Sequence, residues 1–174
     1  MKLNKNVILT GMMGSGKTTI GMMVAKILNL RFLDIDKEIE KLENNSIRRI
    51  FENNGEKYFR EVEEKVTVSE LKSFNKVISL GGGGFTNRNI RKLTQKNHIS
   101  FWLNWKPETI IKRIYKSKKR PIIRNLSRKD IHNMITNRSL VYKHANFKIN
   151  CDNLNKIQIA NTIIKKYESK NNKY

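Results

Sequence analysis

The sequence predicts an α/β fold in which a parallel β-sheet carries helices on both faces. Short apolar runs alternate with longer segments of helical periodicity, which is the pattern of parallel strands joined by crossover helices. The length of 174 residues suits a single domain, and no internal repeat or linker divides it. Ligands of such sheets bind beyond the carboxyl ends of the strands, so functional residues are expected there.

The first predicted strand and helix enclose a glycine-rich loop. Residues 6–10 are an apolar run, and residues 19–30 carry apolar side chains at helical spacing. The loop between them matches the phosphate-binding pattern G-x-x-x-x-G-K-[ST] at every fixed position. Backbone N–H groups and the helix N-terminus make such a loop attractive to anions, and a mononucleotide is the default ligand. The predicted nucleotide-binding residues are Gly14, Ser15, Gly16, Lys17, Thr18 and Thr19.

Two side chains of this loop have expected roles. Lys17 reaches the outer phosphates in the pattern, and Thr18 offers its hydroxyl to Mg²⁺. A chance glycine-rich turn is the alternative, but both flanking elements have the required type and order.

The remaining elements follow in alternation. We predict strands at 31–34, 76–80, 98–103 and 147–150, and helices at 36–42, 46–53, 56–73, 87–96, 107–114, 128–142 and 155–167. Ser46 is expected to cap its helix and Gly55 to end it. The basic segment 116–125 lacks a helical pattern and is predicted to be a mobile loop.

The chain is strongly basic, with a net charge of +21 from 36 Lys and Arg against 15 Asp and Glu. The lysines are scattered along the chain, and we find no aromatic-and-basic RNA motif or zinc-ligand spacing. Nucleic-acid binding is therefore not expected as the function. Steering of anionic substrates is the favoured interpretation.

Cysteine content and hydropathy bear on the cellular compartment. Cys151 is the single cysteine, so no disulfide framework forms within one chain. No apolar stretch approaches the length of a membrane span, and no signal-peptide pattern precedes the first strand. We expect a cytoplasmic protein without membrane association.

Five segments at the predicted sites have a combined likeness: GMMGSGKTTIG, FLDID, IFENNGEKYFREVE, SLGGGGF and KRPII. Together they resemble the shikimate kinase family, over most of the chain. The resemblance implies a P-loop kinase of the nucleoside-monophosphate-kinase-like fold, in which residues 1–174 form one domain. It places a substrate-binding segment at about 34–61 and a mobile lid at about 116–125.

The same resemblance implies the reaction. The γ-phosphoryl group of ATP passes to the 3-hydroxyl of shikimate, giving ADP and shikimate 3-phosphate in aromatic amino acid biosynthesis. ATP is then a co-substrate and one Mg²⁺ is bound per subunit. The expected partners are these two small molecules, and we expect a monomer.

Asp34 and Asp36 stand two residues apart at the end of a predicted strand. One carboxylate can therefore face the phosphate loop and the other an acceptor. By the resemblance, Asp34 assists Mg²⁺ through water, and Asp36 hydrogen-bonds the acceptor hydroxyl. A helix cap is the alternative interpretation of Asp36. Whether Asp36 removes the proton or orients the hydroxyl stays open, because phosphoryl transfer depends more on positioning than on deprotonation.

The acceptor site draws on three further segments. By the resemblance, Arg60 and Arg138 bind the carboxylate of shikimate, for which a guanidinium offers two parallel hydrogen bonds. Gly82 contacts shikimate through its backbone, and Glu63 extends the polar site. The alternatives are a surface i,i+3 ion pair of Arg60 with Glu63, a surface position for Arg138, and a plain tight turn at Gly82.

Arg120 lies in the segment KRPII of the basic loop. By the resemblance it reaches the ATP phosphates when the lid closes, where a positive charge stabilises the transferring group. Lys17, Asp36 and Arg120 then form the catalytic set. The alternative is that Arg120 is one of several solvated charges.

Three rival functions remain at this stage. The nearest is another small-molecule kinase of similar fold, such as a gluconate or nucleoside-monophosphate kinase. The net charge motivates a nucleotide-regulated RNA-binding module, which would show strongly salt-dependent RNA affinity. An inactive structural relative is the third, and the intact Lys17, Thr18 and Asp36 argue against it.

Overall fold

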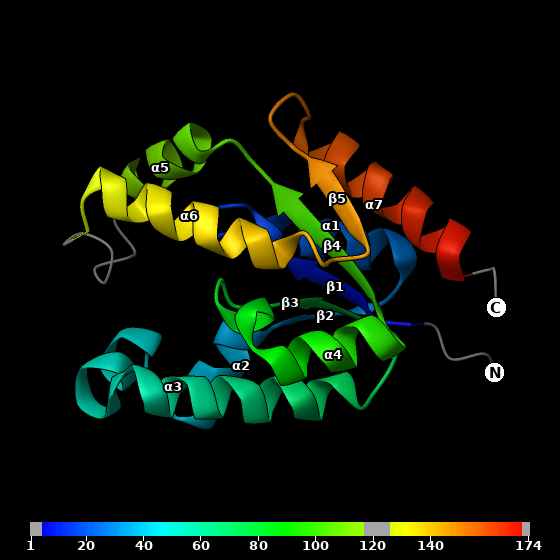
Figure 1. Ribbon diagram of the computed structural model, residues 1–174. Coiled ribbons are helices and arrows are strands. Elements are labelled where there is room, and N and C mark those ends of the chain that lie inside the picture. Colours follow the sequence, from blue (N-terminus) through cyan, green and yellow to red (C-terminus); the bar gives the residue numbers. More distant parts are fainter. Residues whose placement is uncertain (1–4, 117–125, 172–174) are drawn as a thin grey trace.

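The computed structural model describes residues 5–116 and 126–171, which contain one five-stranded parallel β-sheet (Figure 1). The strands are β1 (Val7–Thr10), β2 (Arg31–Asp34), β3 (Lys76–Ser79), β4 (Ile99–Asn104) and β5 (Phe147–Asn150). Their order in the sheet is β2-β3-β1-β4-β5, and every neighbouring pair is parallel. The predicted parallel α/β fold is confirmed.

Helices connect the strands and cover both faces of the sheet. They are α1 (Lys17–Leu28), α2 (Ile35–Leu42), α3 (Ile47–Leu71), α4 (Arg88–Asn97), α5 (Pro107–Lys116), α6 (Arg128–Tyr142) and α7 (Lys156–Asn171), with a short 3₁₀ helix η1 (Gly84–Thr86). Among the described helices, none is both long and apolar enough to cross a membrane. The predicted lid lies outside the described residues except for Lys116, and Arg120 lies outside them as well.

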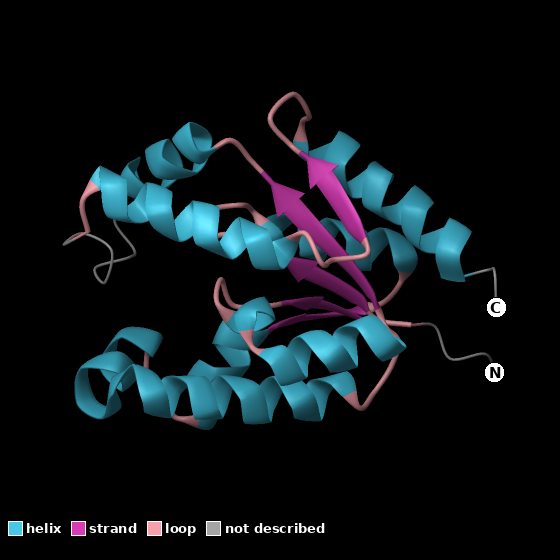
Figure 2. Cartoon of the chain, in the orientation of Figure 1, coloured by secondary structure: helices cyan, strands magenta, loops and turns pink. Residues whose placement is uncertain are grey.

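The core divides into two apolar layers because successive residues of a strand face opposite sides of the sheet. On β1, Val7 and Leu9 pack in the layer that α1 and α7 contribute, whereas Ile8 packs in the layer built with α3, α4, α5 and α6. The sheet therefore lies between two layers of helices (Figure 2).

Local sequence signals set most helix ends. Ser46 caps α3 by accepting a hydrogen bond from the backbone N–H of Arg49, as predicted. Gly55 interrupts α3 with φ 79° and ψ 175°, so the predicted break between two helical segments is confirmed. The first helix begins at Lys17, two residues before the predicted start, since Gly16 in the left-handed conformation already precedes it.

The carboxyl ends of three adjacent strands meet at one edge of the sheet. Leu9 on β1 and Asp34 on β2 both pair with Ser79 on β3, so these residues lie in one row across the sheet. The phosphate loop follows β1, the two aspartates follow or end β2, and the glycine run follows β3. The parallel register thus gathers the predicted site segments at the expected edge.

A buried histidine joins the other end of the sheet to α3. His98 is 3% exposed, and its Nε2 lies 2.9 Å from the carbonyl oxygen of Leu71. Its Nδ1 accepts a hydrogen bond from the backbone N–H of Asn6 at 3.4 Å. Because a carbonyl only accepts and a backbone N–H only donates, these partners assign a neutral imidazole protonated on Nε2. Burial lowers the pKa of His98 below its ordinary value of 6.5.

The depressed pKa of His98 predicts a loss of stability on mild acidification. The unfolded chain binds a proton near pH 6.5 while the folded chain resists it, so the unfolding free energy falls as the pH drops through that value, by at most about 1.4 kcal/mol per pH unit. Urea unfolding between pH 7.5 and 5.5 measures this dependence. His98→Asn flattens it, whereas the exposed His132→Asn keeps the wild-type slope. A wild-type slope in His98→Asn contradicts the assignment.

Candidate active site

The phosphate loop connects β1 to α1 through residues 11–16. Gly11, Gly14 and Gly16 have φ values of 138°, 79° and 87°, a region that side chains rarely adopt, so glycine is required at these turns. Lys17 follows at the start of α1 and is 8% exposed. Its Nζ donates to the carbonyl oxygens of Gly11 at 2.8 Å and Met12 at 3.0 Å, which holds the ammonium group over the loop.

Two side chains that sequence reasoning missed hold this loop from its outer side. Trp105 Nε1 donates to the carbonyl oxygen of Ser15 at 2.9 Å, and Arg113 Nη1 donates to that of Gly14 at 3.3 Å. The signal available in the sequence was the position of Trp105 directly after β4, at the functional edge of the sheet.

Asp34 lies against the phosphate loop and also ends β2. Its Oδ2 accepts a hydrogen bond from Thr18 Oγ1 at 2.7 Å, and its Oδ1 accepts one from the backbone N–H of Asp36 at 3.2 Å. Asp34 is therefore the N-cap of α2, and the interpretation of Asp36 as the cap is wrong because Asp36 already lies in the first helical turn.

The donor set beside the loop fits Mg²⁺. Thr18 and Asp34 supply a hydroxyl and a carboxylate oxygen, the hard ligands that this ion prefers. No group of three or more His, Cys, Asp or Glu residues with metal-ligand geometry occurs among the described residues. A bound Mg²⁺ would therefore take further ligands from water and substrate phosphates, as it commonly does.

The turn after β3 is packed tightly by charged side chains. A Cβ at Gly81 would lie 2.5 Å from Glu63 Oε1 and 2.7 Å from Asp36 Oδ1. At Gly82 it would lie 3.5 Å from Arg138 Nη1, and at Gly83 2.8 Å from Arg60 Cζ. Each of the three glycines thus makes room for a different predicted site residue or its neighbour.

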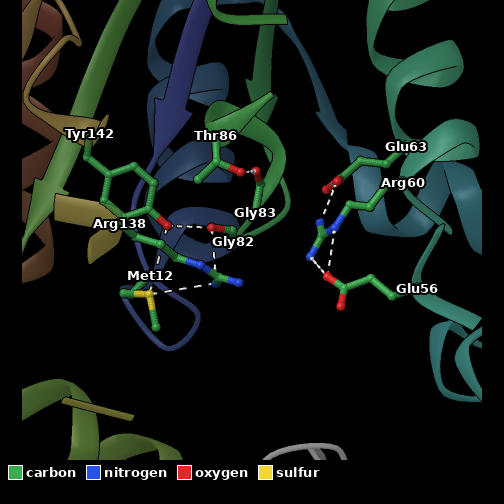
Figure 3. A network of polar contacts seen from close by, with 9 residues as sticks. All are labelled: Met12, Glu56, Arg60, Glu63, Gly82, Gly83, Thr86, Arg138 and Tyr142. Atoms are coloured by element: carbon green, nitrogen blue, oxygen red, sulfur yellow. Dashed lines mark hydrogen bonds and ion pairs between the residues drawn. The ribbon is translucent and has the colours of Figure 1, made fainter. Parts of the chain in front are cut away.

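Arg60 and Glu63 form an ion pair on α3 beside the turn (Figure 3). Arg60 Nη1 donates to Glu63 Oε2 at 2.6 Å, and the exposed Glu56 braces the same guanidinium through its Oε1 at 3.1 Å. The Glu63 side chain is 3% exposed and that of Arg60 is 33% exposed. The interpretation of this pair as a surface ion pair is wrong, since Glu63 is buried against the glycine turn.

The second carboxyl oxygen of Glu63 has no hydrogen-bond partner among the described residues. Burial raises the pKa of Glu63, and the nearby Asp36 charge adds to this rise, while Arg60 opposes it. An oxygen buried against the turn without a partner is uncommon in folded proteins, and it marks Glu63 as a candidate site residue.

Arg138 and Tyr142, one turn apart on α6, hold the other side of the glycine turn (Figure 3). Arg138 Nη1 donates to the carbonyl oxygen of Gly82 at 3.3 Å, and the Tyr142 hydroxyl donates to the same oxygen. Burial raises the pKa of Tyr142 to about 12, so this hydroxyl stays protonated as a donor. In Figure 3 the guanidinium groups of Arg138 and Arg60 extend toward one another from opposite sides of the turn.

The Phe59 ring lies beside Arg60 and packs on Phe51. Phe51 and Phe59 have ring centroids 4.6 Å apart, and Arg60 Cζ lies 5.1 Å from the Phe59 centroid. They give this end of the site an apolar wall next to its charges.

A cavity of about 710 Å³ lies against the phosphate loop and is lined by none of the glycine-turn residues. The loop residues Ser15 and Gly16 and the helix residue Thr19 line one wall. Further lining residues come from the β4–α5 connection, from α5 and from the start of α7, among them Trp105, Arg113, Asn155, Lys156 and Ile157. The volume and the mixed apolar and polar lining suit a nucleoside attached to the phosphates.

The structure thus gathers nearly all the sequence-predicted site residues at one edge. Thr18 and Asp34 lie beside the phosphate loop, and Asp36, Arg60 and Arg138 surround the glycine turn. The turn also touches the loop, because a Cβ at Gly82 would lie 3.3 Å from the backbone nitrogen of Met13. The phosphate loop and the glycine turn are therefore adjacent.

Known proteins match most of this chain. A family model described as shikimate kinase matches residues 13–168. A shikimate kinase of Persephonella marina is 38% identical over 92% of this chain and 97% of its own length. That of a Sulfurihydrogenibium species is 40% identical over 93% of this chain and 97% of its own length.

A solved structure has the same fold. A shikimate kinase from Acinetobacter baumannii in complex with shikimate has a TM-score of 0.90 to this fold and 30% sequence identity, covering 96% of this chain and 94% of that one. Since the family model spans residues 13–168 and the two relatives match more than nine tenths of the chain, the chain belongs to the shikimate kinase family.

Proposed function

We propose that this chain is an ATP-dependent kinase that transfers the γ-phosphoryl group of ATP to the 3-hydroxyl of shikimate. The products are ADP and shikimate 3-phosphate. The observation that carries this proposal is the meeting of Asp36, Arg60 and Arg138 around the glycine turn, directly beside the phosphate loop. A ring acid with hydroxyl groups satisfies both guanidinium groups and the carboxylate.

On the nucleotide side, the phosphate loop binds the ATP phosphates through residues Gly14, Ser15, Gly16, Lys17, Thr18 and Thr19. Lys17 leaves its two loop carbonyls and bonds the outer phosphate oxygens, where its charge stabilises the transferring group. The cavity beside Thr19 takes the nucleoside, with Lys156 in its lining. Arg120, outside the described residues, adds a further charge to the phosphates.

Thr18 and Asp34 would hold Mg²⁺, the hydroxyl directly and the carboxylate through water. When bound, this ion neutralises charge on the phosphate oxygens. Asp34 also accepts a hydrogen bond from the backbone N–H of Asp36 as the cap of α2, which fixes the position of Asp36. The side chain of Asp34 thus connects Thr18 on the nucleotide side with Asp36 on the acceptor side.

On the acceptor side, Arg60 and Arg138 bind the shikimate carboxylate from opposite sides. Arg138 and Tyr142 hold the Gly82 carbonyl oxygen, and the backbone N–H of Gly82 donates to the substrate. Asp36 accepts a hydrogen bond from the 3-hydroxyl and orients the hydroxyl oxygen toward the γ-phosphorus. Glu63 holds Arg60 in place and extends the polar site.

Several broader features belong to the same proposal. Residues 1–174 form one domain, with the substrate-binding segment at about 34–61 and a lid at about 116–125. A monomer is part of this proposal. Consumption of ATP supports the cytoplasm as the compartment.

Acceptor identity is the first test. ADP release, measured with a coupled assay, is expected to require shikimate and to stay at background with gluconate or AMP. Arg60→Ala removes a charged carboxylate ligand and is expected to raise the KM for shikimate roughly 10- to 100-fold. The matched control is Arg48→Ala on the same helix, where an exposed i,i+4 pair with Glu52 is lost. Equal ADP release with and without shikimate contradicts the function.

The space at the glycine turn gives a second prediction. A methyl group at Gly83 would overlap the guanidinium of Arg60, which is the far end of a flexible side chain, so Gly83→Ala is expected to fold and to raise the KM for shikimate about 10-fold by displacing the guanidinium. Gly84→Ala is the control, because its Cβ meets only ordinary contacts of 3.4 Å or more. Identical kinetics of both variants would show that Arg60 does not bind the substrate.

The metal assignment gives a third prediction. Asp34→Asn keeps an N-cap for α2 but loses the charge, so the Mg²⁺ concentration for half-maximal rate is expected to rise about 10-fold. Titration of Mg²⁺ at fixed ATP measures it. Asp130→Asn, which alters the exposed capping box of α6, is the control and keeps the wild-type requirement. An unchanged Mg²⁺ requirement in Asp34→Asn excludes this carboxylate.

A further inference from the structure

Trp105 joins the sheet to the phosphate loop. It lies between β4 and α5, half-buried, and lines the nucleoside cavity. Its indole N–H donates to the Ser15 carbonyl 90 positions earlier in the chain. An indole N–H is a single donor in the ring plane, so this bond sets the direction in which the carbonyl points.

The direction of that carbonyl fixes the next amide. In a planar trans peptide the C=O of Ser15 and the N–H of Gly16 point in opposite directions. With the oxygen held toward Trp105, the Gly16 N–H is turned to the opposite side of the loop. The Gly14 carbonyl is held in the same way by Arg113. Two consecutive peptide planes of the loop are therefore oriented from outside.

The ring of Trp105 also holds Arg113. The Arg113 Cζ lies 3.7 Å from the ring centroid, which is a close stacking distance for a guanidinium on an indole. One face of the guanidinium is thus covered while its edge bonds Gly14. Arg113 is confined to one arrangement, in which it lines the nucleoside cavity.

The backbone that carries Trp105 is itself anchored. Asp152, in the connection after β5, accepts hydrogen bonds from the backbone N–H of Lys106 and the hydroxyl of Thr109, each at 2.8 Å. The β4 residue Asn104 accepts a bond from the backbone N–H of Cys151 at 2.9 Å. These hydrogen bonds hold the backbone on both sides of Trp105 in place, which a positioning residue requires.

We propose that Trp105 is a positioning residue of the nucleotide site. Its N–H sets the peptide plane that presents the Gly16 amide, and its ring confines Arg113 at the cavity wall. The inference rests on the proposed function for the identity of the nucleotide. Trp105 therefore supports nucleotide binding through Ser15 and Arg113, and it has no part in binding the acceptor.

Two variants separate the contributions. Trp105→Phe keeps an aromatic ring beneath Arg113 and removes the N–H, and is expected to raise the Kd for ADP about 3- to 10-fold in the presence of Mg²⁺. Trp105→Leu removes the stacking as well, with an expected rise of about 10- to 30-fold. Calorimetric titration with ADP measures both without an acceptor. Steady-state assays should show the same ranking in the KM for ATP, with the KM for shikimate within about twofold of wild type.

Phe147→Leu is the matched control. This half-buried ring stacks on Phe101 within the sheet, and no described contact joins it to the phosphate loop. It is expected to lose stability without changing the ADP affinity. Wild-type ADP affinity in both Trp105 variants overturns the proposal, and so does an equal rise in both KM values, which indicates a structural role alone.

The ADP titration also keeps this proposal separate from the proposed function. If the wild type binds ADP but shows no shikimate-dependent turnover, the acceptor assignment fails while the ranking of the Trp105 variants still decides the role of Trp105. If turnover depends on shikimate and the ranking is absent, the role of Trp105 fails alone.

Discussion

The site depends on a steric constraint just after β3, at the first three of four consecutive glycines. Side chains from α2, α3 and α6 converge on Gly81, Gly82 and Gly83 at separations that a Cβ would not permit for the first and third of them. None of these three glycines has a positive φ, so the constraint at Gly81 and Gly83 is one of space and not of backbone conformation. This room lets Asp36, Glu63 and the two arginines surround one point.

Burial strengthens the electrostatic interactions of the charged side chains around this turn. Removing the Glu63 carboxylate from water has a free-energy cost, which the short bond from Arg60 offsets only in part, since the pKa of Glu63 is still raised. In return the guanidinium is held before any ligand arrives, and the Gly82 carbonyl is held by its two donors. Preorganised groups of this kind lose little entropy when an anion binds, which is the condition for precise alignment of a hydroxyl with a phosphoryl group.

Local patterns could be predicted from the sequence, and distant pairings could not. The spacing from Gly11 to Thr18, the cap at Ser46 and the break at Gly55 are all set by neighbouring residues. Arg60 and Glu63 were predictable as partners at i,i+3, but their burial depends on the turn after β3. Asp34, and not Asp36, caps α2 because β2 ends at Asp34. The sequence alone does not fix where β2 ends, since either aspartate could serve as the cap.

The sequence by itself determined the fold class, the phosphate loop and the family motifs, because each is encoded in contiguous residues whose backbone preferences and periodicity act locally. The tertiary structure alone decided that β3 lies between β2 and β1, that Trp105 supports the Ser15 carbonyl and that Arg138 and Tyr142 share Gly82. These contacts join segments tens of residues apart, and they form only when the packing of both helical layers brings the strand ends together.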